Sequence, residues 1–194
     1  MTQISANAAL IIVDVQTGFK EQDYFGGNRN NPDAEAHIAA LLDAWRSTGR
    51  PVFHVKHNSV SLNSPLRPGQ AGNDIKPEVA PLPGEPLIEK NVNSAFIGTD
   101  LEQRLREAGI SQVVIVGLTT NHCVSTTTRM AGNLGFDTVL VADATATFDR
   151  IGVDGTRYDA QLMHDTTLAS LNGEFATVLN TSDVLAQLQQ HTAQ

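Results

Sequence analysis

The sequence predicts an α/β fold of three layers, α/β/α, in which helices cover both faces of a doubly wound, mostly parallel six-stranded sheet. Short runs rich in Val and Ile recur along the chain, and amphipathic segments with helical spacing lie between them. The runs are continuously apolar, which is typical of strands that are buried on both faces. Strands separated by helices pair in parallel through right-handed crossovers, so this alternation favours a single doubly wound sheet.

The first half of the chain supplies three strands and two helices. Residues 8–14 form an apolar run that ends in an acid, which predicts the first strand. The first helix begins near Pro32 and ends at Gly49, because proline suits a helix start and glycine the position just past its end. Its apolar residues recur at helical spacing: Ile38, Leu41, Leu42 and Trp45. The other elements of this half are strands at 51–55 and 86–90 and a helix at 99–109.

The second half repeats the alternation. Residues 113–116 are apolar and β-branched and lead into Gly117, which predicts a buried strand. A helix opens at Asn121 and runs to about Asn133, so Cys123 lies in the turn between strand and helix. The remaining elements are strands at 138–142 and 174–179, a helix at 158–171 and a last helix capped by Ser182 and Asp183.

Length and composition indicate one domain over residues 1–194, because 194 residues with 41% hydrophobic content can bury one core but hardly two. Residues 58–86 are the exception to the alternation. They are rich in Ser, Asn, Pro and Gly, and we expect a long loop that Ile75 and Val79 pin to the body. Loops of this length often serve as lids or binding loops. A contact between subunits of a homo-oligomer, a dimer or tetramer, is the alternative use.

Charge and cysteine content restrict the partners and the compartment. The net charge of −8 argues against a nucleic-acid partner, whose phosphates would be repelled. Cys123 is the only cysteine, which excludes an intramolecular disulfide and fits a cytoplasmic location. The chain starts without a basic segment before its apolar run, and no stretch reaches membrane-spanning length, so we expect no membrane partner.

Three polar residues stand where ligands bind in open parallel sheets, beyond the carboxyl ends of the strands. Asp14 ends the first strand, Lys90 ends the third, and Cys123 follows the fourth. Taken singly, each has a structural explanation: a turn residue, a solvated charge or a small buried hydrophobe. Taken together, they supply an acid that can accept the thiol proton, an amine that can stabilise a thiolate, and a nucleophile. The opening of a helix should also lower the pKa of the thiol.

Three motifs carry a resemblance to a known family: Asp14-Val-Gln-Thr-Gly-Phe19, Glu89-Lys-Asn-Val-Asn-Ser-Ala-Phe96 and Gly117-Leu-Thr-Thr-Asn-His-Cys-Val124. In order and spacing they are similar to the signature of the isochorismatase-like cysteine hydrolases, which include nicotinamidases and N-carbamoylsarcosine amidases. The resemblance covers nearly the whole chain and implies a catalytic triad of Asp14, Lys90 and Cys123. It also implies a cis peptide between Leu118 and Thr119, with the backbone amides of Thr119 and Cys123 aimed at the substrate oxygen.

The activity that the resemblance implies is cysteine-dependent hydrolysis of a small-molecule amide or ureido C–N bond, an EC 3.5 type of reaction, through a thioester and without a cofactor. Hydrolysis of a vinyl ether, as in isochorismate, is an alternative, although true isochorismatases do not use this cysteine chemistry. A non-catalytic flavodoxin-like binding module with a redox-sensitive thiol is an alternative of another class. Against it, the chain has no resolving cysteine and no Gly-rich phosphate loop after Asp14.

The sequence offers few metal ligands and several candidates for substrate contact. Nicotinamidases carry a metal site with an aspartate and several histidines after the second strand. This chain has only His54 and His57 there, which point to opposite faces of an alternating strand, so we expect no metal. Packing or substrate contact is the expected use of both histidines. The expected substrate-binding residues are Phe19, Leu118 and His122. Structural roles are expected for three other polar residues: Gln16, Asp143 and His164.

Overall fold

A parallel sheet of six strands forms the centre of the computed structural model, which describes residues 3–192. The strands lie in the order β3-β2-β1-β4-β5-β8, and each neighbouring pair is parallel. Their bounds are Ala9–Val13 (β1), Val52–His57 (β2), Leu87–Lys90 (β3), Gln112–Leu118 (β4), Asp137–Ala146 (β5) and Thr177–Leu179 (β8). The predicted doubly wound sheet is therefore confirmed, and its strand order reverses between β1 and β4.

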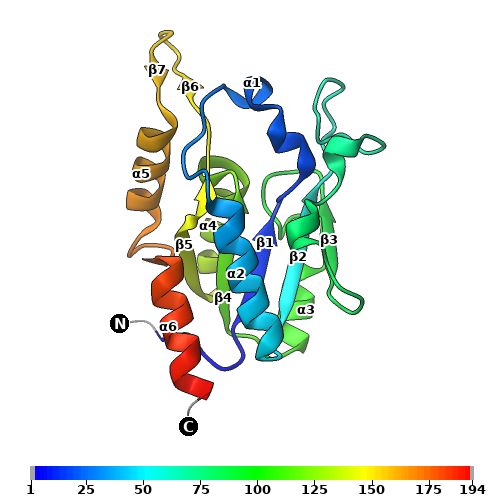
Figure 1. Ribbon diagram of the computed structural model, residues 1–194, viewed down its shortest axis with the longest axis vertical. Coiled ribbons are helices and arrows are strands. Elements are labelled where there is room, and N and C mark those ends of the chain that lie inside the picture. Colours follow the sequence, from blue (N-terminus) through cyan, green and yellow to red (C-terminus); the bar gives the residue numbers. More distant parts are fainter. Residues whose placement is uncertain (1–2, 193–194) are drawn as a thin grey trace.

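Helices cover both faces of this sheet, which confirms the three layers (Figure 1). The helices are α2 (Ala34–Ser47), α3 (Leu101–Glu107), α4 (Ser125–Asn133), α5 (Ala160–Leu171) and α6 (Thr181–Thr192). On β1, Leu10 and Ile12 pack with α2 and α6, whereas Ile11 and Val13 pack with α3, α4 and α5. Successive side chains of a strand point to opposite faces of the sheet, and here helices cover both faces. Every residue of β1 is therefore buried, which explains why the whole run is apolar. Of the described helices, none has the length and apolar content needed to cross a membrane.

Short elements that the periodicity did not predict lie in the connections between the main strands and helices. They are η1 (Thr17–Lys20), α1 (Gln22–Phe25), η2 (Ala71–Asn73), η3 (Pro77–Val79), η4 (Thr120–Val124) and the antiparallel hairpin of β6 (Arg150–Ile151) and β7 (Arg157–Tyr158). The helix expected from residue 158 begins at Ala160 instead. Tyr158 pairs with Arg150 in the hairpin, and the Asp159 side chain caps α5 by accepting a hydrogen bond from the Leu162 amide.

The fifth strand is longer than predicted and the sixth is shorter. β5 continues to Ala146 past a register irregularity opposite β4, and β8 begins at Thr177. Asp143 therefore lies inside β5 rather than at its end. Its carboxylate accepts hydrogen bonds from the amide and hydroxyl of Thr181, both at 2.8 Å, so it holds the start of α6.

The segment 58–86 is anchored to the body, as expected. Val79 is fully buried in the core, and Ile75 packs against the same cluster and forms a β-bridge with Gln16. Lys76 forms an ion pair with Glu35 of α2, which also binds Arg29. Although burial raises the pKa of Glu35, the hydrogen bonds from Arg29 and Lys76 lower it to about 2. The loop is thus held as a wall beside the sheet edge.

Gly117 allows β1 and β4 to lie close together just before the functional edge. Its φ is +124°, and a Cβ added there would lie 2.0 Å from the Val13 carbonyl oxygen. A side chain at this position would push apart the two strands that lead to Asp14 and Thr119. This glycine is therefore required by both conformation and space.

We predict that Gly117→Ala lowers the free energy of unfolding by about 2–4 kcal/mol, because backbone strain and the clash with β1 add. Gly109→Ala is the matched control: its φ is +65°, but nothing lies within 4 Å of an added Cβ. We expect about 1–2 kcal/mol for the control from the left-handed conformation alone. Urea unfolding of both variants measures the difference. Equal stability of the two would contradict the close approach.

Candidate active site

The structure brings Asp14, Lys90 and Cys123 together at the carboxyl edge of the sheet. The Lys90 ammonium donates a hydrogen bond to Asp14 Oδ2 at 2.7 Å and contacts Cys123 Sγ at 3.3 Å. The side chains of Lys90 and Asp14 are 0% and 1% exposed. Burial of two charges is tolerated because they are paired at hydrogen-bond distance.

Asp14 is held in an unusual backbone conformation at the end of β1. Its φ is +53°, in the left-handed region that few residues other than glycine adopt. The Gln16 side chain fixes this turn, because it binds the amide and the carbonyl of His57 at 2.9 and 3.0 Å and the carbonyl of Asn73 at 2.9 Å. The expected structural role of Gln16 is therefore confirmed. Strained residues of this kind concentrate at functional sites.

One carboxylate oxygen of Asp14 is left without a partner. Oδ2 binds Lys90, whereas Oδ1 is buried and accepts no hydrogen bond from any residue that the structure describes. An oxygen of Asp14, a ring nitrogen of His57 and Cys123 Sγ all lie within 4.8 Å of one another. An unpaired buried carboxylate oxygen costs stability. Beside a thiol it can serve as a proton acceptor.

The turn that carries Cys123 differs from the expected helix start. The chain forms a wide π-type turn, η4, before α4 begins at Ser125, and the peptide bond from Leu118 to Thr119 is cis. Burial and the nearby Asp14 carboxylate raise the pKa of the Cys123 thiol, and the opposing effect of Lys90 is smaller. The expectation of a lowered thiol pKa is therefore wrong. The reason is that desolvation disfavours the thiolate more than a helix start would favour it.

His57 is a member of this cluster whose role the sequence left open. The Lys90 ammonium donates to its Nδ1 at 3.1 Å. Burial and the charge of Lys90 lower the pKa of His57, so the ring is neutral and can accept this bond. His54 lies on the other face of β2, is fully buried, and binds Glu85 at 2.8 Å. The predicted opposite orientation of the two histidines is confirmed.

The donor atoms of Asp14, His57 and Cys123 are close enough to hold a metal ion. The Lys90 ammonium, however, already contacts the same three side chains at 2.7, 3.1 and 3.3 Å. A divalent cation at this place would meet a positive charge at van der Waals distance, which is strongly repulsive in a buried site. The residues present therefore fit an ammonium-centred cluster and not a metal centre.

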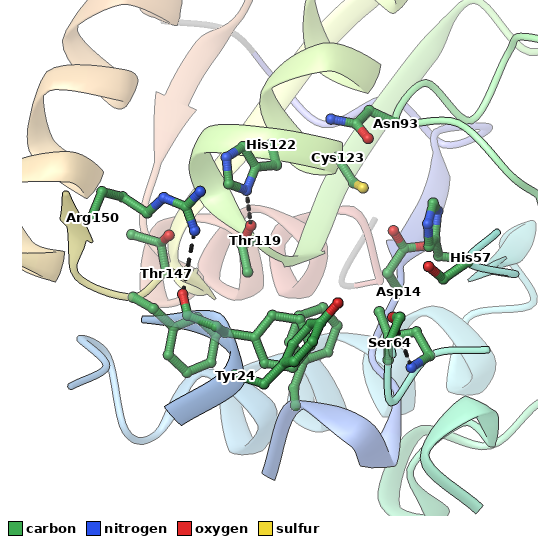
Figure 2. A pocket seen from close by; sticks show the side chains of 15 residues that line it. Asp14, Tyr24, His57, Ser64, Asn93, Thr119, His122, Cys123, Thr147 and Arg150 are labelled. Atoms are coloured by element: carbon green, nitrogen blue, oxygen red, sulfur yellow. Dashed lines mark hydrogen bonds between the residues drawn. The ribbon is translucent and has the colours of Figure 1, made fainter. Parts of the chain in front are cut away.

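A cavity of about 330 Å³ opens beside Cys123 (Figure 2). One side is aromatic, and its Phe25 ring lies 4.5 Å from Phe19 and 5.4 Å from Phe148 between centroids. Phe19 thus lines the cavity, as expected. The other side carries polar groups: Asp14, His57, Asn93, His122 and Cys123. The size and the mixture of apolar walls with few polar groups suit one small organic molecule.

The two other expected contact residues differ in position. His122 lines the cavity beside Thr119, with 3.3 Å between Nδ1 and the threonine hydroxyl, and burial is the main cause of its lowered pKa. Leu118 does not line the cavity: it is fully buried in a cluster that includes Phe148. The reason is that β4 extends through Leu118, so its side chain continues the buried side of the strand. His164 is buried and binds the Thr120 hydroxyl at 2.8 Å, a structural role.

The sequence did not single out several lining residues: Tyr24, Phe25, Asn93, Phe148 and Arg150. They come from α1, from the segment after β3 and from the start of the β6–β7 hairpin, which are far apart in the chain. The available signal was weak. It consisted of aromatic residues in segments without periodicity. Sequence patterns could not group these residues, because only tertiary contacts bring them to one cavity.

Comparison with known proteins gives consistent matches over nearly the whole chain. The isochorismatase domain family model matches residues 8–183. The uncharacterized isochorismatase family protein YrdC of Bacillus subtilis is 49% identical over 177 residues, 91% of this chain and 94% of that protein. Nicotinamidase 3 of Arabidopsis thaliana is 29% identical over 186 residues, 89% of this chain and 84% of that protein. A solved structure, described as a hydrolase of the isochorismatase family from Chromobacterium violaceum, has a TM-score of 0.92 at 43% identity and covers 98% of this chain and 99% of that chain.

We predict that Lys90→Met slows alkylation of Cys123 by iodoacetamide at a fixed pH near 8. Lys90 lowers the thiol pKa, so its loss should raise that pKa further and reduce the fraction of reactive thiolate. Lys20→Met, at an exposed lysine, is the control. Alkylation rates across a pH series, together with circular dichroism to verify folding, make the test. Identical pH profiles for the two variants would show that the charge of Lys90 does not affect the pKa of the Cys123 thiol.

Proposed function

The chain belongs to the isochorismatase family, and on this premise we propose that it is a cysteine-dependent amidohydrolase that cleaves an amide or ureido C–N bond of a small molecule through a thioester. The observation that carries the proposal is the position of the Lys90 ammonium between the Asp14 carboxylate and the Cys123 thiol. This arrangement joins a base, a fixed cation and a nucleophile in one buried cluster at the edge of a cavity. Such a set is suited to acyl transfer.

The first half of the proposed reaction forms the thioester. Cys123 Sγ attacks the carbonyl carbon while its proton passes to the free Oδ1 of Asp14. The raised thiol pKa supports a transfer that accompanies attack, since a free thiolate is scarce beforehand. The backbone amides of Thr119 and Cys123 donate hydrogen bonds to the developing oxyanion. The protonated Asp14 then gives its proton to the departing nitrogen, and the C–N bond breaks.

The second half hydrolyses the thioester. A water molecule loses a proton to Asp14 and attacks the same carbonyl carbon, and the thiol leaves with that proton. The net reaction converts a primary amide and water into an acid and ammonia. For a ureido compound the acid is a carbamic acid, which then loses CO2 and leaves an amine. Lys90 stays charged throughout and stabilises whichever neighbour is anionic, the carboxylate or the sulfur. His57 keeps the ammonium in place by accepting a hydrogen bond from Lys90 Nζ at its Nδ1.

Amide hydrolysis is favoured over the two alternative functions, vinyl ether hydrolysis and non-catalytic binding. A relative named nicotinamidase supports an amide substrate. A vinyl ether hydrolase would not need the Asp14–Lys90–Cys123 cluster. A flavodoxin-like binding module would hold a phosphate group at the loop after β1, whereas here that loop turns into η1 and carries the buried Asp14. The homo-oligomeric state and the cytoplasmic location stay predictions.

We predict that Cys123→Ala reduces turnover by about 10³-fold or more, because no other group can form the thioester. The measurement is ammonia release from a panel of small amides and ureido compounds, with pyruvate release from isochorismate followed in parallel. The melting temperature should stay close to that of the wild type, since Cys123 is only partly buried and lies at the sheet edge. A variant that retains most of the rate on a confirmed amide, or pyruvate release without ammonia release, would contradict the proposal.

We also predict that the reaction needs no metal ion, because Lys90 supplies the positive charge at the cluster. Dialysis against a strong chelator should leave the rate of ammonia release unchanged, and elemental analysis should find less than one metal ion per chain. Loss of activity on chelation that zinc, iron or manganese restores would show that the ammonium-centred cluster is not the whole catalytic apparatus.

A further inference from the structure

The helix α5 buries a histidine where a packed helix usually buries an apolar side chain. Its buried residues are Ala160, His164 and Leu171, and His164 is 3% exposed. Burying an imidazole is unfavourable unless its ring nitrogens find hydrogen-bond partners. His164 does not line the catalytic cavity, so contact with a ligand there does not explain its burial. The partners of its two nitrogens therefore indicate what the residue does.

One arrangement of hydrogen bonds accounts for both nitrogens of His164. The side-chain nitrogen of Asn31 lies 3.4 Å from Nε2. Both hydrogens of that nitrogen are already donated, to the carbonyls of Ala142 at 3.1 Å and Thr145 at 2.7 Å. Nε2 therefore carries the ring proton, and it donates to the Ala142 carbonyl. Nδ1 is then the acceptor, and the Thr120 hydroxyl donates to it at 2.8 Å. Burial lowers the pKa of His164, which keeps the ring neutral and Nδ1 able to accept.

Thr120 opens the turn that carries the nucleophile. It is fully buried and is the first residue of η4, whose wide turn closes where the Ser125 amide donates to the Thr120 carbonyl. Cys123 lies inside this closed turn, and Figure 2 shows it at the cavity together with Thr119 and His122. A restraint on Thr120 is therefore a restraint on the backbone from Thr119 to Cys123.

The support behind His164 is held in place by several bonds. The Ala142 carbonyl accepts from His164, from Asn31 and from the Thr145 hydroxyl at 3.0 Å. These contacts lie at the register irregularity of β5 opposite β4. Asn31 itself has a φ of +42°, in the left-handed region that asparagine tolerates better than most residues. The Thr120 hydroxyl thus meets an acceptor whose position is fixed by β5, by α5 and by the segment before α2.

We propose that His164 is a positioning residue of the active site: its Nδ1 holds the Thr120 hydroxyl and thereby sets the backbone amides of Thr119 and Cys123 at the substrate carbonyl. This inference rests on the proposed amidohydrolase function and adds to it a residue that does not touch the substrate. Neither His164 nor Thr120 lines the cavity, so their contribution passes through the backbone of η4. The expected signature is weaker stabilisation of the oxyanion with unchanged reactivity of the thiol.

The first test compares Thr120→Val, which removes the hydroxyl at nearly constant volume, with the matched control Thr138→Val. Thr138 is a buried threonine near the amino end of β5, and its hydroxyl donates to the Phe136 carbonyl at 3.1 Å. We expect Thr120→Val to lower kcat for a confirmed amide by about 10–100-fold with KM within about threefold, and the control to change neither. The loss is partial because Asn121 of η4 keeps its own hydrogen bond from the Thr147 hydroxyl. Equal kcat values for the two variants would overturn the proposal.

Variants of His164 test the other end of the same bond. His164→Asn keeps an acceptor oxygen near the place of Nδ1, whereas His164→Leu removes it. We expect the leucine variant to lose kcat by about 10–100-fold and the asparagine variant to stay within about threefold of the wild type. The double variant Thr120→Val/His164→Leu should be no slower than His164→Leu, because both changes remove one interaction. Circular dichroism verifies that each variant is folded. A double variant whose loss is the product of the single losses would contradict action through Thr120.

An aldehyde probe keeps the inference independent of amide turnover. The thiol adds to an aldehyde carbonyl, R–CHO + HS–Cys → R–CH(OH)–S–Cys, and the oxygen of this adduct takes the place of the oxyanion. We expect propanal and benzaldehyde to protect Cys123 of the wild type from iodoacetamide, and about tenfold more aldehyde to be needed for Thr120→Val. Without aldehyde the two proteins should be alkylated at rates within about twofold, since displacement of iodide develops no oxyanion.

The outcomes of the aldehyde experiment separate this inference from the proposed function. Absence of protection in the wild type, or equal protection of Thr120→Val, would refute the role of His164 whether or not the chain hydrolyses amides. A tenfold difference in protection in a protein that cleaves no amide of the panel would support the role of His164 in the turn and refute the amidohydrolase function alone.

Discussion

The buried ammonium of Lys90 is the interaction on which the rest of the site depends. It joins three side chains that arrive from three strands, because Asp14 follows β1, His57 ends β2, and Cys123 follows β4. A charged lysine beneath a cavity is tolerated only while the paired carboxylate remains, since either charge alone would be strongly destabilising. The same pairing leaves one carboxylate oxygen free to accept a proton. The Lys90–Asp14 ion pair is therefore needed both for the stability of the buried charges and for the proposed proton transfer.

The parallel sheet supplies the cluster, whereas irregular segments supply the cavity. Gly117 permits the close approach of β1 and β4, and the Gln16 side chain ties the turn after β1 to the end of β2. The aromatic wall comes from η1, from α1 and from the residues between β5 and β6, and the segment 58–86 is held by Lys76 and Glu35. Rigid strands fix the reacting atoms, and variable loops set what fits beside them. This division is common in open α/β enzymes.

Sequence patterns predicted the sheet, its five main helices and the convergence of Asp14, Lys90 and Cys123, because these follow from local periodicity and from one rule about parallel strands. The sequence patterns failed for properties that depend on contacts between residues far apart in the chain. The thiol pKa is raised because burial and Asp14 outweigh Lys90, and burial cannot be read from a turn. The expectation that Leu118 contacts substrate is wrong because β4 extends two residues beyond the apolar run at 113–116. Arg150 lies in a two-residue strand whose Asp154-Gly155 turn is the only local signal.

The most direct test of the account is mass spectrometry of the intact protein quenched in acid during turnover of a confirmed amide. The account predicts that the protein gains the mass of the acyl group, that peptide mapping places it on Cys123, and that hydroxylamine removes it, as expected of a thioester. Rapid turnover of the amide by a metal-free protein that never carries an acyl group, even when deacylation is slowed by low temperature, would contradict nucleophilic attack by Cys123 and with it the central role of the Lys90 cluster.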